Sequence, residues 1–108
     1  MLYKISVTSY FKKQAKRLIK KYPSLKTELD NLVDSLQSEP EQGVAIGNHS
    51  YKIRLAIASK GKGKSGGARV ITHIQVIQKN IFLLSIYDKS EHGNIDDKEL
   101  LGLINFLP

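Results

Sequence analysis

The sequence predicts one α+β domain in which two amphipathic helices pack on a small, mainly antiparallel sheet. Two helical patterns occupy the first forty residues, and three strand-like segments follow them, at 51–58, 68–77 and 81–87. The chain has 108 residues, which is enough for one modest hydrophobic core, and it has no internal repeat or linker. We therefore expect residues 1–108 to form a single domain.

The first half of the chain predicts a short strand followed by a helical hairpin. Residues 2–7 alternate as a strand does, and Thr8 or Ser9 is a suitable N-cap for the helix that follows. That helix should end at Pro23, and a second should run from about Ser24 to before Pro40. Each helix carries an apolar stripe at helical spacing: Phe11, Ala15, Leu18, Ile19 and Tyr22 in the first, and Leu25, Leu29, Leu32, Val33 and Leu36 in the second.

The second half predicts three strands and a short final helix. Residues 51–58 and 68–77 alternate, whereas 81–87, "IFLLSIY", are nearly all apolar, as expected of a central strand. Lys79 and Asn80 suit a tight turn between the last two strands. Asp96 and Glu99 form a possible capping pair ahead of the final helix. Residues 41–50 and 59–67 are expected to be loops.

Composition narrows the possible functions. The chain has no cysteine, so disulfides and thiolate chemistry are excluded, and His49, His73 and His92 show no metal-binding spacing. We expect no metal and no cofactor. No apolar run has the length of a signal peptide or of a membrane span, which favours a cytoplasmic protein that does not enter a membrane.

The net charge of +7 is concentrated in two segments. Residues 12–22 and residues 52–69 each carry six more Lys and Arg than Asp and Glu, while the rest of the chain is net acidic. Clusters of this kind suit a polyanion, because each cation placed against a phosphate releases condensed counterions. An ordinary solvated basic surface is the alternative.

The stretch "KGKGKSGGARV" (60–70) resembles the end of a nucleotide-binding phosphate loop but lacks its context. Ala58 stands where the first glycine of that loop is needed, and a strand pattern follows where a helix is required. We therefore interpret the stretch as a flexible basic link between two strands, with Lys64 and Ser65 near its tip.

Several side chains that suit phosphate chemistry should converge on one sheet face. Lys52 and Arg54 are two residues apart on a strand, so both leave the same face roughly 6 to 7 Å apart. A hairpin would bring Arg69, at the start of the next strand, close to them. Tyr87 and Lys89 end the apolar strand, and His92 in the following loop is a candidate proton carrier.

These segments resemble the HigB-like branch of the RelE/ParE superfamily of bacterial toxins. The resemblance covers nearly the whole chain and is carried by "YPSLKTELDNLVDSL", "YKIRLAI", "GKGKSGGARVI" and "IFLLSIYDKSE". It implies a microbial-ribonuclease-like fold. It also implies an activity: cleavage of mRNA in the ribosomal A site without a metal, through attack of the substrate 2′-hydroxyl on the neighbouring phosphate.

The resemblance implies a role for each candidate. Arg54 and Arg69 would clamp the phosphate, Lys52 or Lys64 would act as base or proton relay, and Tyr87 or His92 would act as acid or stack on a base, with Lys89 near a further basic catalytic position. Contacts to RNA or the ribosome are expected from Lys12, Lys13, Lys16, Arg17, Lys20, Lys60, Lys62 and Ser65.

The resemblance also implies partners. These are a cognate antitoxin, expected to be a helix-turn-helix protein from an adjacent gene, together with the ribosome and mRNA. Operator DNA would be contacted only through the toxin–antitoxin complex. Two other functions stay open: a ParE-like toxin that poisons DNA gyrase, and a non-catalytic RNA-binding module.

Overall fold

The computed structural model describes residues 2–61 and 63–108, and it has the α+β architecture that the sequence predicts. Its sheet has five strands in the order β1-β5-β4-β3-β2, of which β1 is parallel to β5 and the other neighbours are antiparallel. In chain order the elements are β1 (Lys4–Val7), α1 (Ser9–Lys21), α2 (Leu25–Ser38), β2 (Val44–Gly47), β3 (Ser50–Leu55), η1 (Ala58–Lys60), α3 (Gly63–Gly66), β4 (Ala68–Gln75), β5 (Asn80–Asp88) and α4 (Asp97–Asn105).

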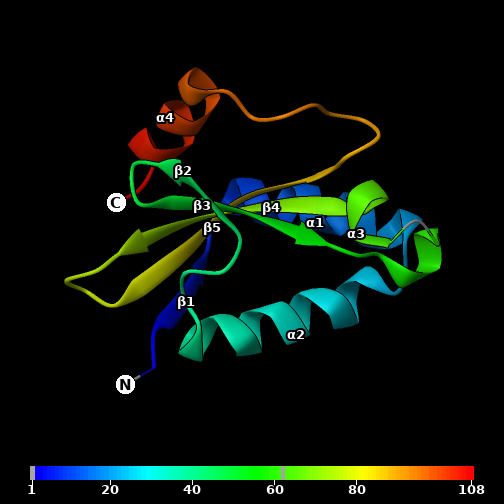
Figure 1. The fold of residues 1–108 in the computed structure, drawn as a ribbon, viewed down its shortest axis with the longest axis horizontal. Coiled ribbons are helices and arrows are strands. Elements are labelled where there is room, and N and C mark those ends of the chain that lie inside the picture. Colours follow the sequence, from blue (N-terminus) through cyan, green and yellow to red (C-terminus); the bar gives the residue numbers. More distant parts are fainter. Residues whose placement is uncertain (1, 62) are drawn as a thin grey trace.

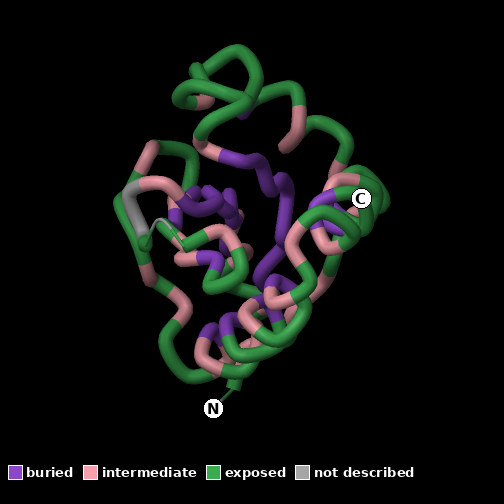
Figure 2. Tube along the Cα trace, turned by 90° about the vertical axis from the view of Figure 1, so that its right-hand side faces the viewer, coloured by how far each residue is buried: buried purple, intermediate pink, exposed green. Residues whose placement is uncertain are grey.

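Helices cover both faces of the sheet (Figure 1). The predicted hairpin of α1 and α2 packs on one face through both apolar stripes, against β-strand residues such as Val70 and Ile81. The short helix α4 covers the other face, where its buried Leu100 belongs to a smaller cluster with Ile71 and Leu84. The buried residues therefore lie in the middle of the molecule, and exposed turns surround them (Figure 2). Because β4 and β5 are covered on both faces, they are buried along most of their length.

Local chemistry determines where helix α1 of the hairpin begins and ends. The Thr8 side chain caps α1 by accepting a hydrogen bond from the Phe11 amide at 3.1 Å. Pro23 follows α1 and prevents its continuation, because proline has no amide hydrogen to donate. These boundaries confirm the predicted helices.

One edge of β5 pairs with β1 along its first half and contacts α1 further along. The pairing of β1 with β5 ends at Val7 and Leu83, so the next residues of β5 have no strand on that side. Gln14 of α1 takes this place: its Oε1 accepts hydrogen bonds from the Ile86 amide and from the Ser85 hydroxyl, both at 3.1 Å. The inner side of α1 is thereby fixed beside β5.

Two predicted loops are wrong in part. Residues 44–47 form β2, an edge strand that turns into β3 through Asn48 and His49, both with positive φ (56° and 57°). The predicted flexible link at 59–67 contains η1 and α3, and β3 ends at Leu55 rather than at the predicted residue 58. Gly67 closes this segment tightly, because a Cβ there would lie 2.2 Å from the Leu55 carbonyl oxygen.

Candidate active site

Three side chains line up across neighbouring strands near one end of the sheet, on the face that α4 covers. Arg54 of β3 pairs with Arg69 of β4, which pairs in turn with Tyr87 of β5. Directly paired residues project from the same face, so these side chains form one row. Lys52 belongs to the next row of that face, opposite Ile71. The structure thus brings together three of the predicted cations, Lys52, Arg54 and Arg69, with the predicted Tyr87.

Arg69 is the buried arginine of the row, only 3% exposed, whereas Arg54 is exposed. Its Nη1 donates to the Ala68 carbonyl oxygen at 3.1 Å, which fixes the guanidinium beside the backbone. Burial, and then the charge of Arg54, lower the pKa of Arg69 from its ordinary value. An arginine nevertheless keeps its proton at neutral pH. Two neighbouring guanidinium groups repel each other, and an anion bound between them relieves that repulsion.

Tyr87 is 6% exposed, and its ring packs against that of His92 at a tilt of 40°, with ring centroids 4.7 Å apart. Burial raises the pKa of Tyr87, against weaker opposing effects of the Ile95 backbone and the Arg69 charge. The phenol therefore keeps its proton at neutral pH. In this state it can donate a hydrogen bond or a proton, which suits an acid rather than a base.

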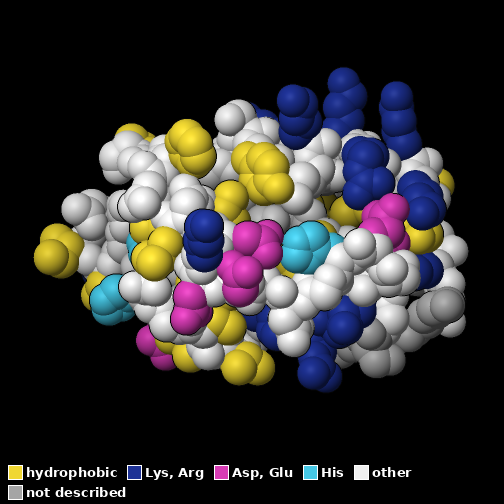
Figure 3. Space-filling view, turned by 90° about the horizontal axis from the view of Figure 1, so that it is seen from above, with side chains coloured by type: hydrophobic (Ala, Val, Ile, Leu, Met, Phe, Trp, Pro, Cys, Tyr) yellow, Lys and Arg dark blue, Asp and Glu magenta, His cyan; other side chains and the backbone are white. Residues whose placement is uncertain are grey.

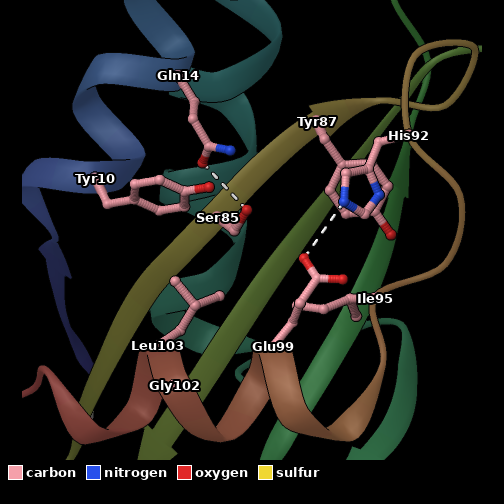
Figure 4. A pocket seen from close by; sticks show the side chains of 9 residues that line it. All are labelled: Tyr10, Gln14, Ser85, Tyr87, His92, Ile95, Glu99, Gly102 and Leu103. Atoms are coloured by element: carbon pink, nitrogen blue, oxygen red, sulfur yellow. Dashed lines mark hydrogen bonds and ion pairs between the residues drawn. The ribbon is translucent and has the colours of Figure 1, made fainter.

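His92 is held in place by Glu99, which the sequence predicts only as part of a helix-capping pair. Its Nε2 lies 3.3 Å from Oε2 of Glu99 on α4, and its Nδ1 lies 2.6 Å from the Gly93 carbonyl oxygen (Figure 4). Both ring nitrogens thus lie beside oxygen atoms of neighbouring groups, which hold the ring in place. The predicted capping pair is half present: Asp96 accepts from the Glu99 amide at 2.8 Å, while the Glu99 carboxylate turns to His92.

Two of the predicted catalytic lysines, Lys52 and Lys89, have contacts near this row. The Lys52 ammonium donates to Oδ1 of Asn94, in the loop between β5 and α4, at 3.2 Å. Lys89 is half-buried, and its amide donates to the Gly67 carbonyl oxygen, which joins the end of β5 to the start of β4. Lys62 and the side chains of Lys64 and Ser65 lie outside the described residues.

Lys60 differs from its expected role at an RNA surface. Its side chain is 8% exposed and forms an ion pair with Asp88, which is completely buried. Asp88 also accepts hydrogen bonds from the Tyr22 hydroxyl at 2.9 Å and the Ser90 amide at 2.9 Å. Burial alone would raise the pKa of Asp88, but the hydrogen bonds from Lys60, Ser90 and Tyr22 outweigh it and hold that pKa well below its usual range. Lys60 therefore fastens η1 to the end of β5 and is not presented to a phosphate backbone.

The basic residues predicted on α1 are exposed. Figure 3 shows Lys and Arg side chains along one margin of the face that α4 covers, with a histidine and acidic side chains nearer its centre. Arg17 is also tied to the loop after β5, because its Nη2 lies 3.1 Å from Oε1 of Glu91. The exposed basic residues of this helix are Lys12, Lys13, Lys16, Arg17, Lys20 and Lys21.

A hollow of about 190 Å³ opens beside the row, between α1, β5 and α4 (Figure 4). Side chains from all three elements face it: Tyr10, Gln14, Ser85, Tyr87, His92, Ile95, Glu99 and Leu103, with Gly102 beside them. Gln14, Asn94 and Glu99 lie in the site but were not predicted for it from the sequence. For Gln14, the sequence offers one indication, which is a polar residue on the buried side of α1 between Phe11 and Ala15.

No group of three or more His, Asp or Glu side chains suited to a metal ion occurs in residues 2–61 and 63–108. Within the same ranges, no helix is both long enough and apolar enough to span a bilayer.

The fold and the site together define a small basic protein that presents arginines and an aromatic pair on one face of a sheet. The family model of the RelE toxin of the RelE/RelB toxin–antitoxin system matches residues 4–106, so this chain belongs to the RelE toxin family. The structure of a double arginine-to-alanine mutant of the Escherichia coli toxin RelE in the free state is similar. Its TM-score is 0.65 at 13% sequence identity, and the match covers all of both chains. At that identity the likeness supports the shared fold.

Proposed function

We propose that this protein is the toxin of a type II toxin–antitoxin system, of the HigB-like type, and that it stops translation by cutting mRNA on the ribosome. The observation that carries the proposal is the row of Arg54, Arg69 and Tyr87, with Lys52 beside it and the His92 ring packed against Tyr87. The row combines two cations for a phosphate with two proton donors for a leaving group. Membership of the RelE toxin family supports the same function.

The chemistry follows from these groups. The substrate 2′-hydroxyl loses its proton and attacks the adjacent phosphorus, the bond to the 5′-oxygen of the next nucleotide breaks, and a 2′,3′-cyclic phosphate remains. Arg54 and Arg69 bind the phosphate oxygens, whose negative charge grows in the transition state. Arg69 is held in place before substrate arrives, so little reorganisation is needed.

Proton transfer is divided between two pairs of candidate side chains. Tyr87 and His92 are the candidate donors to the departing 5′-oxygen, because Tyr87 is held as a neutral phenol and the His92 ring lies against it. Lys52 or Lys64 takes up the proton of the 2′-hydroxyl or relays it. No step in this scheme calls on a metal or a cofactor.

The proposal includes partners. A cognate antitoxin, of the helix-turn-helix type and encoded by an adjacent gene, neutralises the toxin, and operator DNA is reached only through their complex. The exposed lysines of α1 are proposed to contact ribosomal RNA, since a line of cations on one helix suits a phosphate backbone. Ribosomes are the site of action, which places the protein in the cytoplasm.

The test is a translation extract supplied with the wild-type protein, with Arg54→Ala, or with Lys26→Ala as a control. Both replaced side chains are exposed, but Lys26 lies on α2, away from the row. Wild type and Lys26→Ala should halt translation and leave mRNA cut at fixed codon positions. Arg54→Ala should be at least about 100-fold slower, because it removes one stabiliser of transition-state charge.

Intact mRNA at several-fold excess of toxin over ribosomes would overturn the proposal. Salt-dependent RNA binding without cleavage would then identify a binding module. A DNA-damage response with unimpaired translation would identify a gyrase poison.

A further inference from the structure

We propose that the hollow between α1, β5 and α4 binds one nucleobase of the mRNA and selects a base that carries an amino group. The inference rests on the proposed mRNA cleavage and adds to it a determinant of sequence preference. Glu99 and Gln14 are the residues that form hydrogen bonds with the base and select it, and neither is among the residues that the sequence predicts for the site.

The walls of the hollow suit a flat ring. The Tyr10 ring, 52% exposed, faces it from α1, and the tilted ring pair of Tyr87 and His92 faces it from the end of β5 and the loop beyond (Figure 4). Ile95 and Leu103 add apolar surface. The volume of about 190 Å³ far exceeds the ~10–15 Å³ that one water molecule needs. Unpaired RNA bases are bound by stacking on aromatic side chains in this way.

Gln14 presents a donor to the hollow. The Ile86 amide can only donate, so the oxygen of the Gln14 side chain must be the atom that faces it, at 3.1 Å. The Ser85 hydroxyl donates to the same oxygen. With its oxygen occupied by β5, the side chain has its NH₂ group left to donate to a carbonyl oxygen or ring nitrogen of a base.

Glu99 presents an acceptor. A carboxylate has no hydrogen to donate, and Oε2 of Glu99 lies 3.3 Å from His92, so acceptor capacity remains for a ligand. The Watson–Crick edges of adenine, cytosine and guanine carry an amino group that can donate to it. Uracil instead has carbonyl oxygens on both sides of its single N–H, and these repel a carboxylate. The carboxylate also disfavours a phosphate in the hollow, so the hollow accepts the base and not the backbone.

The hollow lies beside the proposed scissile phosphate. Neighbouring strands are ~4.8 Å apart, so Arg69 on β4 is one strand away from Tyr87 on β5, and α1 lies on the opposite side of β5. A phosphate held by Arg54 and Arg69 and a base held against Tyr10 thus lie on opposite sides of the Tyr87–His92 pair. The selected base belongs to a nucleotide that flanks the cut.

The test compares wild type with Glu99→Gln and with Asp97→Asn as a control. Asp97 is an exposed acid in the first turn of the same helix but does not line the hollow. Cleavage ends on ribosome-bound mRNAs of all codons are mapped for each protein. Wild type and Asp97→Asn should avoid uracil at one codon position about five- to tenfold, the discrimination expected of one good base contact. Glu99→Gln, whose amide can donate to a uracil carbonyl, should lose this avoidance even if its total rate changes.

A second measurement separates this inference from the proposed function. Trinucleotides with 2′-O-methyl groups cannot be cut, and their binding is titrated without ribosomes. Oligonucleotides of adenine, cytosine or guanine should bind wild type more tightly than the uracil one, and Glu99→Gln should narrow that difference. Equal binding of all four, or one cleavage profile for wild type and Glu99→Gln, would overturn the base subsite. Base-dependent binding without any cleavage would overturn the proposed function and leave the subsite standing.

Discussion

Replacement of Lys60 by methionine should lower the free energy of unfolding strongly, because it leaves the buried Asp88 carboxylate without its cation. Asp88 is 0% exposed and Lys60 is 8% exposed, so neither charge is solvated by bulk water. Breaking a buried ion pair from one side costs about 3–5 kcal/mol. Asp88 keeps its hydrogen bonds from Tyr22 and Ser90, so we expect the lower end, about 3 kcal/mol. That loss is a large part of the ~5–15 kcal/mol that stabilises a typical domain.

The measurement is urea unfolding, with thermal unfolding beside it. A loss of about 3 kcal/mol should lower the melting temperature by roughly 12–24 °C in a domain of this size. The control is Lys26→Met, which breaks the exposed pair with Asp30 on α2 and should cost no more than about 0.5 kcal/mol. The double variant Lys60→Met with Asp88→Asn should recover part of the loss, because a neutral amide oxygen still accepts from Tyr22 and Ser90.

The same pair sets a dependence on pH. The pKa of Asp88 is lower in the folded protein than in the unfolded chain, where it is ~3.9. Its stabilisation is therefore complete above that unfolded value and is lost as the pH falls through the folded value. The difference between wild type and Lys60→Met should shrink correspondingly below about pH 4. If Lys60→Met were no less stable than Lys26→Met at neutral pH, the ion pair would have no structural role, and Lys60 would be free for the RNA contact that the sequence suggests.

Two further predictions concern Tyr87 and His73. Tyr87→Phe should keep the fold but slow cleavage by about 100-fold or more if the phenol donates the proton. Single-turnover cleavage rates measure this effect. An unchanged rate would leave His92 as the acid. Burial, aided by the charge of His49, lowers the pKa of His73, whose Nδ1 lies 3.1 Å from the Ser50 hydroxyl; the backbone of Asn48 opposes that shift. The folded protein thus favours neutral His73, and the stability that this gives is present above pH ~6.5 and is lost as the pH falls below it. His73→Gln should flatten that part of the curve of unfolding free energy against pH, and an unchanged slope would show that His73 does not titrate differently on folding.

Periodicity accounts for the parts of the fold that were predicted. Alternation along a strand decides which side chains share a face, so Lys52 and Arg54 could be paired from the sequence, and the predicted hairpin to the next strand placed Arg69 beside them. The helical stripes and the caps at Thr8 and Asp96 depend on local chemistry and were predicted correctly.

Tertiary packing decides the parts that were not predicted. The residues of β2, Val44–Gly47, are too few to show alternation, and they become a strand because β3 has a free edge. The burial of Lys60 depends on Asp88, 28 residues further along the chain. The position of Glu99 beside His92 depends on how α4 docks, which capping chemistry does not reveal. The sequence does not reveal the role of Gln14, because its side chain accepts from the Ile86 amide only where β1 stops pairing with β5.

The most direct test of the central claim is single-turnover cleavage of mRNA on purified ribosomes with an open A site, with the ends of the products identified. Wild type should leave a 2′,3′-cyclic phosphate at a fixed position in the codon, and Arg54→Ala should form the same product at least about 100-fold more slowly. Intact mRNA, or an equal rate for Arg54→Ala, would contradict the claim that the row of Arg54, Arg69 and Tyr87 is the active site.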